Sequence, residues 1–307
     1  MKKNYKFDVA GLGVCSMDYL GIVPHYPKID TKTEMIEFTK QSGGLVGTAL
    51  TTLARLGAKV CYIGKLGDDD FSNFLINDFK KEGVGIKDVI IEPKSSTYFS
   101  FCLVEKKSGK RTIVLTRKNV KNVKEKEIPY QVIASSQYLL VDQYDLGASI
   151  AAAKYAKEHN VKVVAVVEAM LPKINKLLNL IDILIPNEKF ALKYTGEKNF
   201  TQAAKKLFQS KNYEIVVVTA GKKGCVVVTK EGVSTYPAFK VKVVDTTGAG
   251  DAFHGAFIYG MLKNWDLEKI AKFSNAVASI NCTRLGGRSS LPNLREVNKF
   301  LDERRGK

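Results

Sequence analysis

Short runs of apolar, mostly β-branched residues alternate with amphipathic stretches along most of the chain. The apolar runs have the length of buried strands, and the amphipathic stretches repeat apolar residues at helical spacing. The predicted strands are 7–14, 59–67, 138–143, 161–168, 181–187, 214–221 and 224–230, and the predicted helices are 46–56, 70–82, 147–159, 187–194, 200–210, 251–262 and 267–283. This alternation predicts βαβ units, and hence an α/β fold with a mainly parallel sheet and helices on both faces.

Two segments, 18–42 and 92–117, break the alternation because strand-like stretches follow one another there without a helix. Residues 97–117 are typical of a β-hairpin with its turn at 107–110. We expect the two segments to form a small β-sheet that covers one edge of the main sheet. The chain contains no internal repeat or low-complexity linker, so residues 1–307 are expected to form a single domain with this sheet inserted.

The most informative stretch is VVDTTGAGDAFHG at 243–255, where an extended segment ends in a turn of small residues. A helix is expected to begin at Asp251. Glycines let the backbone approach a phosphate, and the N–H groups of a helix's first turn point at it. A carboxylate there can take a proton from an attacking hydroxyl while the amides hold the anionic transition state. A capped helix after a glycine turn is the purely structural alternative.

DTTGAGDAF, residues 245–253, resembles the C-terminal signature of the PfkB family of carbohydrate and nucleoside kinases. The resemblance implies a ribokinase-like three-layer α-β-α sandwich and ATP-dependent phosphoryl transfer. It also implies that Asp251 is the catalytic base and that Gly248, Ala249 and Gly250 line the anion hole. The small sheet from 18–42 and 92–117 would then be a lid that closes over the sugar.

The N-terminal half carries a similar signature, in which Gly43 and Gly44 precede a predicted helix. In the family such a glycine pair opens a helix beneath the sugar. Asp18 falls where these kinases keep an aspartate for substrate hydroxyls, and a carboxylate can accept two such hydrogen bonds. Without the resemblance, Asp18 reads equally well as a surface turn residue. Thr48 stands where the signature usually has asparagine, so sugar recognition is expected to differ from that of ribokinase.

Nucleotide contacts are implied for the segment TAGKKG at 219–224 and for Asn275. Thr219, Gly221 and Gly224 would lie beside the phosphates and ribose, and Asn275 near the base. Taken alone, this segment is an ordinary glycine turn. CTRLGGRSSLP at 282–292 resembles the family's loop beside the adenine and a monovalent-cation site, which would link Asp245 and Ser290 to K⁺.

One departure from the family concerns its NxxE motif, which orders Mg²⁺ and its waters. Asn187 is present, but Phe190 occupies the place of the glutamate. Phenylalanine binds neither metal nor water, so either Glu188 substitutes or the metal is held differently. Glu188 would face another side of a helix that begins there, which argues against substitution.

Composition adds little to this interpretation. The formal net charge is +17, but the lysines are spread along the whole chain without a basic block, which favours a solvated surface over a nucleic-acid site. The N-terminal lysines and apolar residues resemble a strand more than a signal peptide, and five scattered cysteines fit buried thiols. We therefore expect a cytoplasmic protein that binds neither nucleic acid nor membrane.

The sequence thus predicts ATP-dependent phosphorylation of a hydroxyl, favoured as a primary one, on a small sugar or sugar derivative. The threonine-containing signature, together with the segments around 245–255 and 282–292, is similar to a branch that includes bacterial sulfofructose kinases and related sugar kinases. This resemblance does not fix the substrate; a ketose or a sugar-acid-like molecule is the leading interpretation, with a ketose-like one favoured. A sugar or nucleotide sensor without catalysis and a nucleoside kinase stay open as alternatives. Pairing of two chains through the lid is a further expectation.

Overall fold

A nine-stranded sheet forms the centre of the molecule, in the order β13-β12-β11-β10-β9-β8-β1-β4-β5. The computed structural model describes residues 5–117 and 119–304. Neighbouring strands are parallel except for the two pairs at one edge, β11–β12 and β12–β13. The strands are β1 (Phe7–Leu12), β4 (Val60–Gly67), β5 (Val89–Glu92), β8 (Ser136–Asp142), β9 (Lys162–Val167), β10 (Ile183–Pro186), β11 (Ile215–Thr219), β12 (Cys225–Thr229) and β13 (Gly232–Tyr236).

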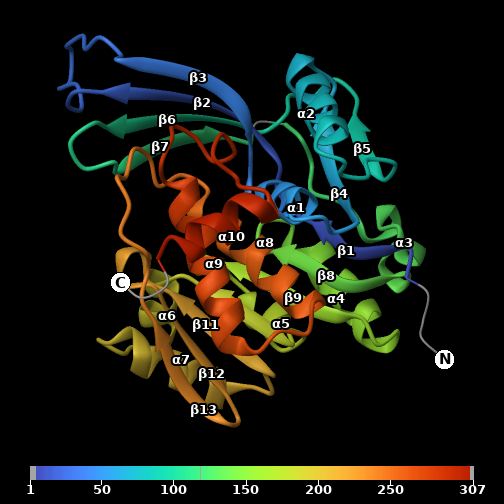
Figure 1. Cartoon of the computed structure of the whole chain (residues 1–307). Helices are drawn as coiled ribbons and strands as arrows, with labels where there is room; N and C mark the ends of the chain where they lie inside the picture. The colour runs from blue at the N-terminus through green and yellow to red at the C-terminus, as the bar shows by residue number, and fades with distance from the viewer. Residues whose placement is uncertain (1–4, 118, 305–307) are drawn as a thin grey trace.

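Helices cover both faces of this sheet, and each face has its own apolar core (Figure 1). Strands buried on both sides must be apolar at consecutive positions, which explains why the strand segments read as continuous rather than alternating apolar runs. One face carries α1 (Leu45–Arg55), α2 (Asp70–Lys81), α8 (Ala249–Leu262), α9 (Leu267–Asn281) and α10 (Leu294–Asp302). The other carries α3 (Tyr130–Ala134), α4 (Leu146–Glu158), α5 (Ile174–Leu178), α6 (Glu188–Thr195) and α7 (Phe200–Ser210).

A separate four-stranded sheet lies at one side of the molecule, beyond the C-terminal helices (Figure 1). Its order is β3 (Glu37–Gly43), β2 (Ser16–Val23), β6 (Phe99–Glu105) and β7 (Arg111–Thr116). β2 and β6 pair in parallel, whereas the outer pairs are antiparallel. The two segments that interrupt the alternation therefore do meet in one small sheet. Its exposed apolar side chains include Phe38, Val114 and Leu115, and pairing of two chains through this sheet stays a prediction.

Several elements differ from the sequence-based expectation. α8 begins at Ala249 rather than at Asp251, which places the carboxylate inside the first helical turn. Three helices, α3, α5 and α10, are absent from those predicted from the sequence. α3 and α5 have only five residues each, which is too few for a periodic signal. α10 does carry a signal in the sequence, because Asn293 and Glu296 form a capping box before a strongly amphipathic stretch. Among the residues that the structure describes, no helix is both long and apolar enough to cross a membrane.

Candidate active site

Two cavities meet at the amino terminus of α8. The larger has a volume of about 820 Å³ and extends toward β11, β13 and α9. The smaller, of about 170 Å³, lies between β2, β6, β7 and the start of α1. Five residues line both cavities: Leu45, Arg111, Glu168, Gly248 and Asp251. Molecules bound in the two cavities would therefore face each other across Asp251.

Buried hydrogen bonds fix the turn that leads into α8. Asp245 is fully buried, and its carboxylate accepts hydrogen bonds from the amide and hydroxyl of Thr247 (2.8 Å each) and from the amide of Gly286 (2.8 Å). Asn281 donates to the carbonyl of Thr247 at 3.0 Å. Gly248 caps the helix at φ 72°, and a Cβ there would come within 2.6 Å of the Cα of Gly287. Only glycine fits this position, for both reasons.

Gly248, Ala249, Gly250 and Asp251 line the larger cavity, as expected for an anion hole. The first N–H groups of a helix have no intrahelical partner and carry the positive end of the helix dipole. Burial raises the pKa of Asp251 well above its usual range. The nearby carboxylate of Glu168 raises this pKa further, while the guanidinium of Arg111 lowers it. A carboxylate with a raised pKa is a better proton acceptor at neutral pH.

Asp18 lines the smaller cavity and is almost fully buried. Its Oδ1 accepts hydrogen bonds from the hydroxyls of Ser16 and Ser100, both at 2.8 Å, and burial raises its pKa. The carboxylate lies directly against Gly43, where a Cβ would be only 1.7 Å from Oδ2. Gly44 lines the cavity and takes φ 84°, at the amino-terminal cap of α1. The two glycines are thus required for different reasons: Gly43 leaves room for the Asp18 carboxylate, and Gly44 takes a positive φ that turns the backbone into α1.

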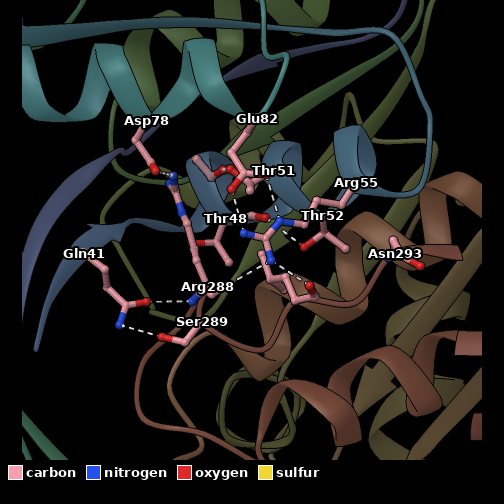
Figure 2. Close-up of polar contacts among 12 residues, drawn as sticks. Gln41, Thr48, Thr51, Thr52, Arg55, Asp78, Glu82, Arg288, Ser289 and Asn293 are labelled. Atoms are coloured by element: carbon pink, nitrogen blue, oxygen red, sulfur yellow. Dashed lines mark hydrogen bonds and ion pairs between the residues drawn. The ribbon is translucent and has the colours of Figure 1, made fainter. Parts of the chain in front are cut away.

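Thr48 lies on α1 but lines neither cavity. Its hydroxyl instead accepts a hydrogen bond from Nε of Arg288 at 3.3 Å (Figure 2). The side chain of Arg288 is buried, pairs with Asp78 at 3.0 Å and donates to the carbonyl of Gly43 at 2.8 Å. The observed partner of Thr48 is therefore this arginine, and a direct contact between Thr48 and substrate stays a prediction.

Arg288 connects the loop at 282–292 to the segment before α1 that contains Gly43 and Gly44. Its backbone amide donates to the side-chain oxygen of Gln41 at 2.8 Å, and the amide nitrogen of Gln41 donates to Ser289 (Figure 2). Nearby, Arg55 forms an ion pair with Glu82 and donates to two carbonyls of the same loop. Since this loop also holds Asp245 through the amide of Gly286, the network fixes the two cavities relative to each other.

All four predicted nucleotide-binding residues line the larger cavity: Thr219, Gly221, Gly224 and Asn275. Gly224 takes φ 90°, and a Cβ there would lie 1.9 Å from the carbonyl of Tyr236. Asn275 is buried, and its amide donates to the carbonyls of Tyr236 and Pro237, at 3.1 Å each. The Asn275 side chain thus holds one wall of the cavity, and its contact with a base stays a prediction.

Phe190 has a structural explanation. It is 1% exposed, belongs to the core under α6 and stacks on Tyr194 with ring centroids 5.5 Å apart. Asn187 lines the larger cavity and also caps α6, because its Oδ1 accepts from the amide of Phe190 at 2.8 Å. Glu188 forms an ion pair with Lys223 at 2.8 Å and lines neither cavity. Residue 190 is therefore a packed helix residue.

The two residues expected at a monovalent-cation site line neither cavity: Asp245 lies in the turn before α8, and Ser290 lies in the loop between α9 and α10. Asp245 already accepts three hydrogen bonds from protein groups. The hydroxyl of Ser290 is buried and has no hydrogen-bond partner among the residues that the structure describes. A K⁺ ion held by Asp245 and Ser290 stays a prediction.

Sequence reasoning missed three residues at the junction of the cavities or beside it. Glu168 follows β9, and Arg111 begins β7, where its Nη1 donates to the hydroxyl of Thr246 at 3.1 Å. Ser100 reaches Asp18 from a position 82 residues away. No local motif marks these positions. Only the general rule that ligands bind beyond the carboxyl ends of parallel strands pointed toward Glu168.

Comparison with known proteins decides the family. Residues 6–294 match the family described as pfkB family carbohydrate kinase. The chain belongs to the PfkB family of carbohydrate kinases. It is 31% identical to the ribokinase of Haemophilus influenzae over 299 residues, which cover 95% of this chain and 97% of that protein. It is 27% identical to the 5-dehydro-2-deoxygluconokinase of Clostridium tetani, with 97% and 94% covered.

A solved structure agrees with this assignment. The ribokinase of Thermotoga maritima superposes with a TM-score of 0.81 at 27% identity, over 96% of the PfkB kinase described here and 99% of that chain. The predicted ribokinase-like α/β fold with a small separate sheet is therefore confirmed. The prediction of a phosphotransferase that acts on a sugar hydroxyl is confirmed as well.

The pH dependence of this PfkB kinase should reflect the raised pKa of Asp251. A general base must be deprotonated, so kcat/KM should fall as the pH drops through a value above the ordinary carboxylate range of about 4. Arg111→Gln removes the charge that lowers this pKa, and the acidic limb should therefore move to higher pH. Lys110→Gln, an exposed neighbour on the same hairpin, is the control and should leave the limb in place. An unmoved limb in Arg111→Gln would contradict this account of Asp251.

Phe190→Glu should destabilise the fold by roughly 3 kcal/mol or more, because it places a carboxylate in a sealed apolar core. Phe190→Leu keeps an apolar side chain and should cost about 1 kcal/mol. Asn187→Ala removes one helix cap and should also cost about 1 kcal/mol. Urea unfolding of the three variants measures these differences. Wild-type stability in Phe190→Glu would mean that this residue does not belong to the core.

Proposed function

We propose that the chain transfers the γ-phosphoryl group of ATP to a hydroxyl of a small sugar, a primary hydroxyl being favoured. One observation carries this proposal: the larger and the smaller cavity share Asp251 at the amino terminus of α8. The larger cavity contains the residues expected to contact the nucleotide, and the smaller contains Asp18, expected to bind sugar hydroxyls. The names of the relatives, ribokinase and 5-dehydro-2-deoxygluconokinase, support a sugar as the acceptor.

The proposed reaction is a direct displacement at phosphorus. The acceptor hydroxyl oxygen forms the new bond to the γ-phosphorus, the bond between that phosphorus and the β–γ bridging oxygen breaks, and ADP leaves. Asp251 takes the hydroxyl proton. The N–H groups of Gly248 to Asp251 face the phosphoryl oxygens and stabilise the charge that spreads over them. Arg111 supplies a positive charge at the same place, because it lines both cavities.

Mg²⁺ would neutralise part of the charge of the nucleotide phosphates. This cation binds proteins through few oxygen ligands and keeps several waters, so one carboxylate and one amide suffice for it. Glu168 and Asn187 both line the larger cavity and fit this requirement. We propose that Glu168 fulfils the role that the family assigns to the motif glutamate, whose position Phe190 occupies here.

The small sheet is positioned to act as a lid over the acceptor. The hydroxyl of Thr246, in the turn before α8, accepts a hydrogen bond from Arg111 at 3.1 Å and lies 3.5 Å from the carbonyl of Gly109. β2, β6 and β7 supply much of the wall of the smaller cavity. Water in the site would accept the phosphoryl group in place of sugar, so closure of this sheet would suppress ATP hydrolysis.

A non-catalytic sensor is less well supported than a kinase. The main reason to consider a sensor is Phe190, and the packing of this side chain in the core gives it a structural explanation. A sensor needs neither a base nor an anion hole, and both groups lie at the junction of the cavities.

Asp251→Asn should lower kcat by about 10² to 10⁴-fold, the usual contribution of a general base. ATP affinity should change little, because the amides and the larger cavity remain. A coupled assay of ADP release across a panel of sugars measures kcat, and titration calorimetry measures ATP binding. Asp70→Asn, an exposed position on α2, serves as the control. Near wild-type turnover in Asp251→Asn with an accepted sugar would refute the proposed base.

Glu168→Gln should raise the Mg²⁺ concentration for half-maximal turnover about tenfold or more, since it removes a carboxylate that orders the metal and its waters. Glu188→Gln is the matched control, because Glu188 pairs with Lys223 outside both cavities. Magnesium titrations of the two variants test this directly. A larger effect in Glu188→Gln than in Glu168→Gln would reverse the assignment.

A further inference from the structure

Arg117 presents a positively charged group in the smaller cavity. It directly follows β7, and it lines this cavity but not the larger one. Its guanidinium lies between the rings of Tyr98 and Tyr144, at 4.6 and 4.7 Å from their centroids. Both tyrosines line the same cavity. Stacking on two rings holds the guanidinium plane in place before any ligand binds.

The hydrogen-bonding capacity of this guanidinium is not used up by the protein. Nη2 of Arg117 is buried, and no group of the described residues accepts a hydrogen bond from it. The ion pairs found within residues 5–117 and 119–304 do not include Arg117. A buried donor without an acceptor is costly, and a charged donor more so. A ligand in the cavity can supply the acceptor.

Two buried carboxylates, Asp142 and Asp145, feel the charge of Arg117, and neither forms an ion pair with it among the described residues. Asp142 is fully buried, and each of its oxygens accepts a backbone amide, from Val14 at 2.6 Å and from Tyr144 at 2.9 Å. Burial also raises the pKa of Asp142 to about 7. Burial raises the pKa of Asp145, and the charge of Arg117 offsets part of this rise, but Asp145 lines neither cavity. Oδ1 of Asp145 also lacks a partner, so a weak pairing with Arg117 is the competing explanation.

The other charged groups of the smaller cavity have different roles. Asp18 is held by two serine hydroxyls and would repel an anion. Arg111 donates to Thr246 and lines both cavities, which suits the phosphoryl group in transfer. Glu168 also lines both cavities, and its Oε1 accepts a hydrogen bond from the hydroxyl of Tyr144 at 2.8 Å. The smaller cavity therefore combines three carboxylates, Asp18, Glu168 and Asp251, with a separate cation, Arg117.

We propose that the acceptor sugar carries an anionic group, a carboxylate, sulfonate or phosphate, and that the guanidinium of Arg117 binds it. This inference rests on the proposed function, in which the smaller cavity holds the acceptor. A carboxylate is planar, and a sulfonate or phosphate is tetrahedral. Each of these groups offers at least two oxygens, which a guanidinium can bind through two N–H groups at once. The orientation of the sugar follows, with the anionic group at Arg117 and the reacting hydroxyl at Asp251.

The test compares neutral ketoses with their carboxylate, sulfonate and phosphate counterparts in the ADP-release assay. The wild-type enzyme should show a kcat/KM about tenfold or more higher for one anionic series, as expected for a charge-assisted hydrogen bond. The series with the highest value identifies the anion. Arg117→Gln should reduce the anionic-to-neutral ratio of kcat/KM about tenfold or more, mainly through KM. Arg117→Lys keeps the positive charge but loses the planar pair of N–H donors. Its anionic-to-neutral ratio of kcat/KM should therefore lie between those of the wild type and Arg117→Gln.

Asp145→Asn is the control for the competing explanation. If Arg117 only pairs with Asp145, then Asp145→Asn and Arg117→Gln should lower stability together and leave the substrate ratio unchanged, which would overturn the proposal. Equal or better use of the neutral ketoses by the wild type would overturn it too. Calorimetric binding of the anionic sugars to wild type and Arg117→Gln, without nucleotide, gives a second readout. If only neutral sugars are phosphorylated, the proposal for Arg117 is wrong and the proposed kinase function stands. If no sugar gives ADP release, both the proposal and the kinase function are refuted.

Discussion

The position of the amino terminus of α8 is the constraint on which the rest of the site depends. Its amides, and the carboxylate in its first turn, are useful only if they lie where two cavities meet. Buried polar contacts from distant parts of the chain hold it there, including those of Asp245 with Gly286 and of Asn281 with Thr247. The Arg288 network then ties the same C-terminal loop to Gly43, beside which Asp18 lies. The two cavities and Asp251 are in this way parts of one connected arrangement.

Charge at this junction is balanced rather than of one sign. Burial raises the pKa of Asp251, and the carboxylate of Glu168, which lines the same two cavities, raises it further. Arg111 offsets this effect from the small sheet, so the position of that sheet and the basicity of Asp251 are physically linked. A site with carboxylates alone would repel ATP, whereas cations alone would leave no proton acceptor. A mixture of both signs suits the proposed reaction, in which a carboxylate accepts a proton from the hydroxyl while that hydroxyl oxygen receives a negatively charged phosphoryl group.

Local sequence patterns predicted the parts of the structure that depend on local physics. Glycine with positive φ at 248, the helix after it and the buried strands all leave a signal within a few residues. Asp18 and Asp251 are candidates because they stand at positions that resemble the family's signatures, and both line a cavity. Ser100, Arg111, Arg117, Glu168 and Arg288 were not assigned roles, because their functions arise from contacts across the fold. The sequence shows that Phe190 occupies the place of the motif glutamate, whereas only the packing shows that it fills the core under α6.

A crystal structure with an accepted sugar and a non-hydrolysable ATP analogue tests the central claim most directly. The account predicts the nucleotide in the larger cavity, with its γ-phosphate at the first-turn amides of α8. It also predicts the sugar in the smaller cavity, with one hydroxyl within hydrogen-bond distance of the Asp251 carboxylate. A nucleotide bound elsewhere, or a sugar whose hydroxyls all lie beyond the reach of Asp251 in the closed complex, would contradict it.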